Sequence, residues 1–263
     1  MSRTALVTGT SSGIGRATAE LLVARGYRVI GTSRNPSEAH LGGVETVKLD
    51  LTDPGDIEAL APLLKTVDVL VNNAGESQSA PFEELPGDWM RRLFEINVFG
   101  PVRLAQLALP GMRERGHGRV VMVGSMLASF PIAYRSGYVA SKAAIKGFST
   151  AARHEFSPFG VWLTTVEPGS IATGINERRT AFVAPDSPHR RDFDTMLAAL
   201  DRNERAGTSP ERVAATILKA VQDRKPRPRY AVGSNAPLVF AARRLAPAAL
   251  VEKLTHRRHN LMR

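Results

Sequence analysis

The sequence predicts an α/β fold, in which a parallel sheet of about seven strands carries helices on both faces. Two observations support this prediction. Short runs of β-branched and other apolar residues alternate with amphipathic stretches of helical length, which is typical of successive βαβ units. Several of the runs are apolar at consecutive positions, as strands covered on both faces should be. Such a pattern indicates a doubly wound sheet of the Rossmann type.

The expected elements follow from these patterns in chain order. We expect strands at 5–7, 27–30, 44–47, 67–71, 119–123, 161–166 and 229–232, and helices at about 13–25, 54–65, 86–114 and 137–156. Pro101 and Pro110 should bend or shorten the third helix, because proline lacks an N–H and clashes with the preceding turn. Residues 170–208 show no clear period before about Asp194, and an insertion of this length is usually functional or disordered.

Composition excludes several classes of function. The chain has no cysteine, so disulfide frameworks, thiol nucleophiles and thiolate metal sites are excluded, and no group of residues has the spacing of a metal site. No apolar run approaches the length of about 18 residues that a membrane span needs. Residues 1–4 lead directly into an apolar strand without a signal peptide, so we expect a cytoplasmic enzyme.

The net charge of +10 lies almost entirely in the C-terminal tail. Residues 224–263 hold ten basic residues and one acid, Glu252, so this segment carries +9. We expect Leu238, Val239 and Phe240 to pack on the body or on a partner subunit, with the arginines in water. The alternative that we weigh is contact with an anionic membrane surface. Nucleic-acid binding is not expected, because no recognised nucleic-acid motif accompanies the charge.

A glycine-rich segment at residues 8–15 joins the first strand to the first helix. Gly9 permits a tight turn, Gly13 lets the backbone approach a phosphate, and Gly15 lets the helix pack on the strand. The free N–H groups and the positive dipole end of the helix then suit a pyrophosphate. The glycine spacing, three residues and then one, differs from the usual dinucleotide fingerprint. The residues that we expect to bind a dinucleotide here are Gly9, Ser11, Ser12, Gly13, Ile14 and Gly15.

The end of the second strand indicates which dinucleotide binds. A fold that prefers NAD carries a carboxylate near this point for the ribose 2′-hydroxyl, but here the residues are Ser33 and Arg34. A hydroxyl and a guanidinium suit a 2′-phosphate, so NADP(H) is favoured over NAD(H). The alternative interpretation is a solvated surface arginine. Further cofactor-binding candidates follow the third and fourth strands: Asp50, Leu51, Asn73, Ala74 and Gly75.

Tyr138 and Lys142 are the most informative pair in the chain. They stand four residues apart in an expected helix, so they share one face. An ammonium beside a phenol favours the phenolate and lowers the pKa of the tyrosine from its ordinary value of about 10. A tyrosine whose pKa is moved toward neutrality can give and take a proton at physiological pH.

Together these motifs resemble the short-chain dehydrogenase/reductase family, in its compact single-domain branch. The resemblance runs from Thr4 to about Gly169. It rests on Thr-Gly-x-x-x-Gly-Ile-Gly, on Asn-Asn-Ala-Gly, on Ser125 placed 13 residues before Tyr-x-x-x-Lys, and on Pro-Gly at 168–169. Within the family, residues 31–34 and 124–129 look most like those of the 17β-hydroxysteroid-dehydrogenase-like reductases.

The resemblance implies a catalytic tetrad of Asn97, Ser125, Tyr138 and Lys142. Tyr138 would be the acid in carbonyl reduction and the base in alcohol oxidation, and Ser125 would stabilise charge on the carbonyl oxygen. Lys142 would hold the nicotinamide ribose and lower the pKa of Tyr138, and Asn97 would position a water that links Lys142 to solvent. The resemblance also implies cofactor contacts from Tyr138 and Lys142, and from a segment closing over the nicotinamide that contains Pro168, Gly169, Ile171 and Thr173.

We therefore expect residues 1–263 to form a single dinucleotide-binding and catalytic domain, with a substrate lid at about 170–208 and a basic tail at about 234–263. The expected substrate is a small hydrophobic carbonyl or secondary alcohol, of steroid, retinoid or ketone type. Apolar walls for it would come from Met126, Leu127, Phe130, Ile132 and Phe182. The family resemblance also implies a homodimer or homotetramer, formed through the two long central helices.

Two other functions fit parts of the pattern. One is a non-catalytic NADP(H)-binding sensor or scaffold, which would not require all four groups of the tetrad. The other is an epimerase or dehydratase, since relatives of that kind use the same Tyr/Lys pair. Those relatives are longer and have a different glycine spacing, which argues against them.

Overall fold

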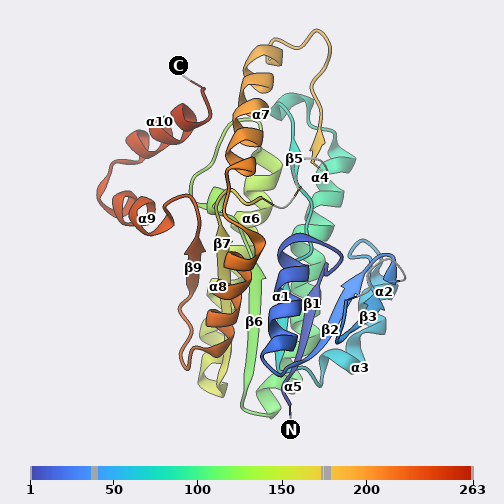
Figure 1. Cartoon of the computed structure of the whole chain (residues 1–263). Coiled ribbons are helices and arrows are strands. Elements are labelled where there is room, and N and C mark those ends of the chain that lie inside the picture. Colours follow the sequence, from blue (N-terminus) through green and yellow to red (C-terminus); the bar gives the residue numbers. More distant parts are fainter. Residues whose placement is uncertain (1, 37–40, 173, 175–178, 262–263) are drawn as a thin grey trace.

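A computed structural model describes residues 2–36, 41–172, 174 and 179–261 (Figure 1). Its core is a parallel sheet of seven strands in the order β3-β2-β1-β4-β6-β7-β9. The prediction of an α/β, Rossmann-type doubly wound sheet is confirmed. The strands are β1 (Thr4–Thr8), β2 (Arg28–Ser33), β3 (Val44–Lys48), β4 (Val69–Asn72), β6 (Gly118–Val123), β7 (Val161–Pro168) and β9 (Arg229–Val232).

Consecutive apolar residues in the central strands supply both faces of the sheet, because successive side chains point to opposite sides. Leu6, Leu70 and Val120 pack into one core together with α5 (Gly100–Glu114) and α6 (Ser136–Phe156). The residues between them, such as Val7, pack into a second core with α1 (Gly13–Ala24) and α8 (Pro210–Gln222). The sheet is therefore covered on both sides, as the strand sequences predict.

Two expected helices are divided in the structure, and proline explains both divisions. The helix expected at 54–65 is α2 (Pro54–Ala59) followed by α3 (Ala61–Leu64), because Pro62 cannot donate to the carbonyl four residues earlier. The helix expected at 86–114 is α4 (Gly87–Phe94), a π-helical turn η3 (Glu95–Phe99) and then α5. Pro101 lies in the first turn of α5, next to the π turn, whereas Pro110 lies inside α5 and does not end it.

The segment after β7 contains more regular structure than its sequence predicts. Helix α7 (Arg190–Arg205) begins before Asp194, and β8 (Thr180–Ala181) pairs with β5 (Gln78–Ser79) in a small separate sheet. Short turns η2 (Phe82–Glu84), η4 (Met126–Ala128) and η5 (Ser157–Phe159) complete the connections. Within the described residues, each helix is either too short or too polar to span a lipid bilayer.

The C-terminal tail forms two helices, α9 (Ala236–Leu245) and α10 (Ala248–Arg258), which extend to one side of the sheet beyond β9 (Figure 1). Phe240 is buried and Val239 packs against the same cluster, as expected. Leu238 does not pack on the body of the chain, because its side chain is 74% exposed. Leu238 follows the buried Ala236 by only two residues, which places it on the opposite side of the helix.

Candidate active site

A cavity of about 1010 Å³ opens at the carboxyl ends of the central strands. The strand order reverses at β1: β2 and β3 lie on one side of it, while β4 lies on the other. Open α/β sheets receive their ligands in the crevice at such a switch point. Residues from the glycine turn, from the ends of β2, β4 and β6, and from α6 line this one cavity.

The glycine turn after β1 has the backbone that its sequence predicts. Gly9 and Gly13 have φ of +71° and +58°, a region that favours glycine. The residues Gly9, Ser11, Ser12, Gly13 and Ile14 line the cavity at the start of α1. Gly15 lies behind the turn, where an added Cβ would stand 2.1 Å from the Gly9 carbonyl oxygen. Gly15 thus permits the close packing of helix on strand and does not line the cavity.

The segment after β4 is tied to this turn. The Asn73 side chain donates to the carbonyl of Thr8 (2.9 Å), and the backbone N–H groups of Asn73 and Ala74 both donate to Thr8 Oγ1 (2.9 Å each). At Gly75, an added Cβ would lie 3.0 Å from Asn97 Oδ1 and 3.5 Å from Lys142 Nζ. The glycine therefore leaves open the space beside the Lys142 ammonium.

The other end of the cavity is lined by Ser33, Arg34, Asp50 and Leu51, as expected for a nucleotide pocket. Burial opposes ionisation of Asp50, but hydrogen bonds from Thr52 outweigh it and hold the pKa of Asp50 below its ordinary value. Arg92, from α4, also lines this end and pairs with Glu76 at 2.7 Å. No motif marks Arg92 in the sequence, because its place depends on how α4 packs beside the sheet.

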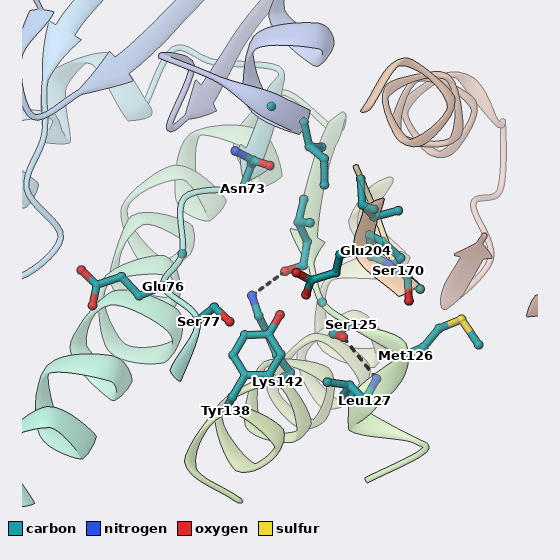
Figure 2. Close-up of a pocket in the computed structure, with 18 of the residues that line it drawn as sticks. Asn73, Glu76, Ser77, Ser125, Met126, Leu127, Tyr138, Lys142, Ser170 and Glu204 are labelled. Atoms are coloured by element: carbon teal, nitrogen blue, oxygen red, sulfur yellow. Dashed lines mark hydrogen bonds between the residues drawn. The ribbon is translucent and has the colours of Figure 1, made fainter. Parts of the chain in front are cut away.

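Ser125, Tyr138 and Lys142 meet on the floor of the cavity (Figure 2). Ser125 ends the loop after β6 and caps the start of η4. Its Oγ accepts a hydrogen bond from Leu127 N at 3.2 Å. The Ser125 side chain is near enough to Tyr138 to favour its phenolate form. Lys142 is buried and donates to the Val123 carbonyl at 3.0 Å, with its Nζ 5.8 Å from the centre of the Tyr138 ring.

The electrostatics of the pair differ from the expectation. Burial raises the pKa of Tyr138, and the main opposing influence is the positive charge of Arg135, followed by the Ser125 side chain. Burial also lowers the pKa of Lys142 to about 8. The lowered pKa that was expected for Tyr138 is therefore not seen, because burial disfavours the charged forms of both side chains.

Asn97 lies behind the cavity wall, in the π turn. Its Oδ1 accepts from Glu76 N at 2.9 Å, and its Nδ2 donates to the Glu76 carbonyl (3.0 Å) and to Ser141 Oγ (3.1 Å). Ser141 in turn donates to the Tyr138 carbonyl at 2.8 Å. Asn97 therefore joins the segment after β4 to the helix that carries Tyr138 and Lys142.

A family model described as short chain dehydrogenase matches residues 3–183, which is more than half of the chain. The chain belongs to the short-chain dehydrogenase/reductase family. Members act on keto and alcohol groups with a nicotinamide cofactor, so this dehydrogenase is an oxidoreductase of CH–OH or C=O groups.

Similar proteins match over nearly the whole chain. The 3-ketodihydrosphingosine reductase of Bacteroides thetaiotaomicron is 32% identical, over 90% of each chain. The NADPH-dependent 3-dehydrocapnine reductase of Ornithobacterium rhinotracheale is 30% identical, over 97% of this chain and 96% of its own. The crystal structure of a short-chain dehydrogenase from Streptomyces avermitilis superposes with a TM-score of 0.80 at 36% identity, and the match covers 93% of this chain and 92% of that one.

A buried polar cluster lies beside Tyr138 in this dehydrogenase. The Arg135 guanidinium is 4.3 Å from the centre of the Tyr138 ring and donates to Ser77 Oγ at 3.0 Å. Burial lowers the pKa of Arg135 to about 10. Glu204 of α7 lines the same cavity (Figure 2). Its carboxylate pairs with Arg179. No motif in the sequence marks Arg135 or Glu204, although Arg135 stands only three positions before Tyr138.

The apolar lining of the dehydrogenase cavity differs in part from the expectation. Met126, Leu127 and Phe130 line the cavity, as expected. Ile132 does not, because it packs in a cluster around Phe193 of α7. Phe182 does not either: its ring stands edge-on to Trp89, 6.1 Å away, on the outside of α4.

Three described residues of the segment expected to close over the nicotinamide line the cavity. Pro168, Gly169 and Ile171 line the cavity of the dehydrogenase across from the glycine turn, and Ser170 N donates to Ser234 Oγ at 3.0 Å. Thr173 lies outside the described residues. Among the described residues, no group of three or more His, Asp or Glu side chains could hold a metal ion.

Proposed function

We propose that this enzyme transfers a hydride between NADP(H) and a hydrophobic ketone or secondary alcohol, with Tyr138 as proton donor and acceptor. The observation that carries the proposal is the meeting of Ser125, Tyr138 and Lys142 in the cavity that the glycine turn also lines. When bound, the nicotinamide cofactor supplies or accepts the hydride. The glycine turn and α1 would hold its pyrophosphate.

The chemistry of the protein is the movement of one proton. In reduction, Tyr138 Oη would donate its proton to the carbonyl oxygen while Ser125 Oγ donates a hydrogen bond to the same oxygen. The raised pKa of Tyr138 keeps the phenol protonated at neutral pH, which is the form that reduction needs. Lys142, whose pKa of about 8 lies near neutrality, is suited to return the proton to Tyr138.

The preference for NADP(H) rests on the basic character of the nucleotide end. Arg34 and Arg92 both line it, beside the Ser33 hydroxyl. A 2′-phosphate carries charge that these guanidinium groups would bind, whereas a 2′-hydroxyl carries none. One relative, 30% identical over almost its full length, is named as NADPH-dependent, which supports the same preference.

The first test measures oxidation of NADPH in the presence of a panel of ketones, aldehydes, steroids and retinoids. Tyr138→Phe should lower kcat by about 100-fold or more, because it removes the general acid. NADPH binding, followed by fluorescence, should change little. Tyr27→Phe is the matched control, since Tyr27 lies at the far end of α1 and does not line the cavity. Turnover retained in Tyr138→Phe would contradict the role of Tyr138.

The same panel separates the enzyme from a non-catalytic sensor. A sensor would bind NADPH with unchanged affinity in both variants and would turn over no substrate in the parent protein. Tyrosine-dependent turnover of any carbonyl excludes that alternative.

A further inference from the structure

The C-terminal helices form one wall of the catalytic cavity. We call α9 and α10, residues 236–258, the C-terminal arm. Its cavity-lining residues come from both helices, and the same cavity contains Ser125 and Tyr138. The arm is thus continuous with the site of reaction.

Aromatic contacts attach the arm to the loop that carries Ser125. The ring of Phe240 stands edge-on to Phe130, with 5.0 Å between ring centres. The guanidinium of Arg229 lies 3.9 Å from the centre of the Phe240 ring. Met126, the residue after Ser125, is buried in the same cluster. The arm therefore meets the carbonyl-binding side of the cavity, away from Arg34 and Asp50 at the nucleotide end.

The arm presents apolar side chains to the cavity. Leu254 lines it yet remains 55% exposed, so part of this wall is in contact with water. Contact of apolar surface with water is unfavourable, and an apolar ligand in the cavity would relieve it. The apolar residues of the arm that line the cavity are Val239, Ala242, Ala246, Val251 and Leu254.

We propose that the groove between the arm and the Met126–Phe130 loop binds a long aliphatic chain of the substrate while its carbonyl lies at Tyr138. This proposal rests on the proposed function and gives it a substrate class, the long-chain aliphatic ketones and alcohols. Met126, Leu127 and Phe130 form one side of the groove, and the apolar residues of the arm form the other.

Two arginines, Arg243 and Arg258, also line the groove. The Arg243 guanidinium lies 5.5 Å from the centre of the Phe130 ring, so a positive charge stands beside this groove. A chain with a terminal carboxylate is therefore included in the test, to distinguish binding of the chain from attraction between charges.

The test uses the full-length protein, NADPH and a series of 2-alkanones from four to fourteen carbons. In the parent enzyme, kcat/KM should rise by about two- to fourfold for each added methylene until the groove is filled. A profile independent of chain length would overturn the proposal. The proposal would also be overturned if kcat/KM rose with chain length only for ketones that carry a terminal carboxylate and not for the neutral 2-alkanones.

Ala242→Trp fills the groove, and Leu245→Trp places the same side chain on the outer surface of the same helix, where Leu245 is 89% exposed. Ala242→Trp should lower the ratio of kcat/KM for dodecan-2-one over butan-2-one by at least tenfold. Leu245→Trp should leave that ratio within twofold of the parent value. Equal effects of the two substitutions would overturn the proposal.

A binding measurement separates this proposal from the proposed function. Calorimetric titration of dodecan-2-ol and butan-2-ol into the protein with NADP⁺ should show tighter binding of the longer alcohol, and Leu254→Asp should abolish the difference. Leu238→Asp is the matched control, since Leu238 is exposed and does not line the cavity. Tighter binding without turnover of any ketone would contradict the proposed reaction and support the groove. Turnover of a ketone together with equal binding of both alcohols would support the proposed reaction and contradict the groove.

Discussion

Arg135 lies closer to the Tyr138 ring than Lys142 does, at 4.3 Å from the ring centre compared with 5.8 Å. Its guanidinium is buried and held by Ser77, so it has little freedom to move away. A buried positive charge beside a phenol favours the phenolate. Arg135, which precedes the first residue of α6, is therefore the cation that most favours the Tyr138 phenolate.

Replacing Arg135 should change the pH dependence of catalysis. Arg135 lowers the pKa of Tyr138, so Arg135→Met should raise it. Alcohol oxidation needs the phenolate, and the rising limb of its pH–rate profile should therefore move to higher pH. The measurement is kcat/KM for oxidation between pH 6 and 11. Arg191→Met, at an exposed arginine of α7, is the control; a limb that does not move in Arg135→Met contradicts the electrostatic role.

Arg34 tests the choice of cofactor. Arg34→Asp should lower the ratio of kcat/KM for NADPH over NADH by at least tenfold, because a carboxylate repels the 2′-phosphate and accepts hydrogen bonds from the 2′-hydroxyl. Arg25→Asp, at the end of α1 and outside the cavity, provides the same charge change. The prediction fails if the two variants give the same ratio.

At the scale of elements, the π turn η3 places Asn97 between the segment after β4 and the helix that carries Tyr138 and Lys142. The turn lies between α4 and α5, and it contains Asn97. Asn97 binds both backbone groups of Glu76 and the hydroxyl of Ser141. Such turns widen the helix locally and frequently occur at functional sites. Here the turn links the segment after β4 to α6.

Two glycines in helices predict opposite effects of the same substitution. Gly15→Ala should lower the free energy of unfolding by about 1–3 kcal/mol and weaken NADPH binding, because the new Cβ meets the Gly9 carbonyl. Gly147→Ala in α6 should raise the free energy of unfolding by about 0.5–1 kcal/mol. At this position an added Cβ meets nothing within 4 Å, and alanine is the better helix former. Urea unfolding of both variants measures the difference, and equal effects would refute this account of Gly15.

At the scale of the whole molecule, the outer face of α5 and α6 carries exposed aromatic side chains. Phe148 of α6 is 48% exposed, and Phe99, immediately before α5, is 52% exposed. Large apolar side chains exposed on neighbouring elements are typical of protein interfaces, and α6 packs against both η3 and α5. We expect this face to join two copies of the chain, as the family resemblance implies.

Phe148→Glu should convert the oligomer into a smaller species, because a carboxylate would have to be buried in the contact. Sedimentation velocity over a range of protein concentrations measures the change. Phe82→Glu makes the same substitution at a side chain that is 79% exposed on η2, and it should leave the assembly unchanged. A parent protein that is already monomeric would exclude the interface.

Local rules account for the parts of the site that could be predicted. The glycine turn depends on φ at Gly9 and Gly13, and the Tyr138/Lys142 pair depends on helical periodicity. Both properties are encoded within a few residues. Helix α8 could also have been predicted, since Ser209 before Pro210 is a recognisable helix start, and Ser209 Oγ accepts from Arg212 N at 3.4 Å.

The sequence by itself determined the sheet, the order of its motifs and the family, because alternating apolar runs and short motifs act over short distances along the chain. Tertiary structure alone decided which cation faces Tyr138, that Glu204 and Arg92 reach the cavity, and that Ile132 and Phe182 do not. It also placed the C-terminal arm against the loop that carries Ser125. These outcomes depend on burial and on contacts between distant segments, which leave no periodic pattern in the sequence.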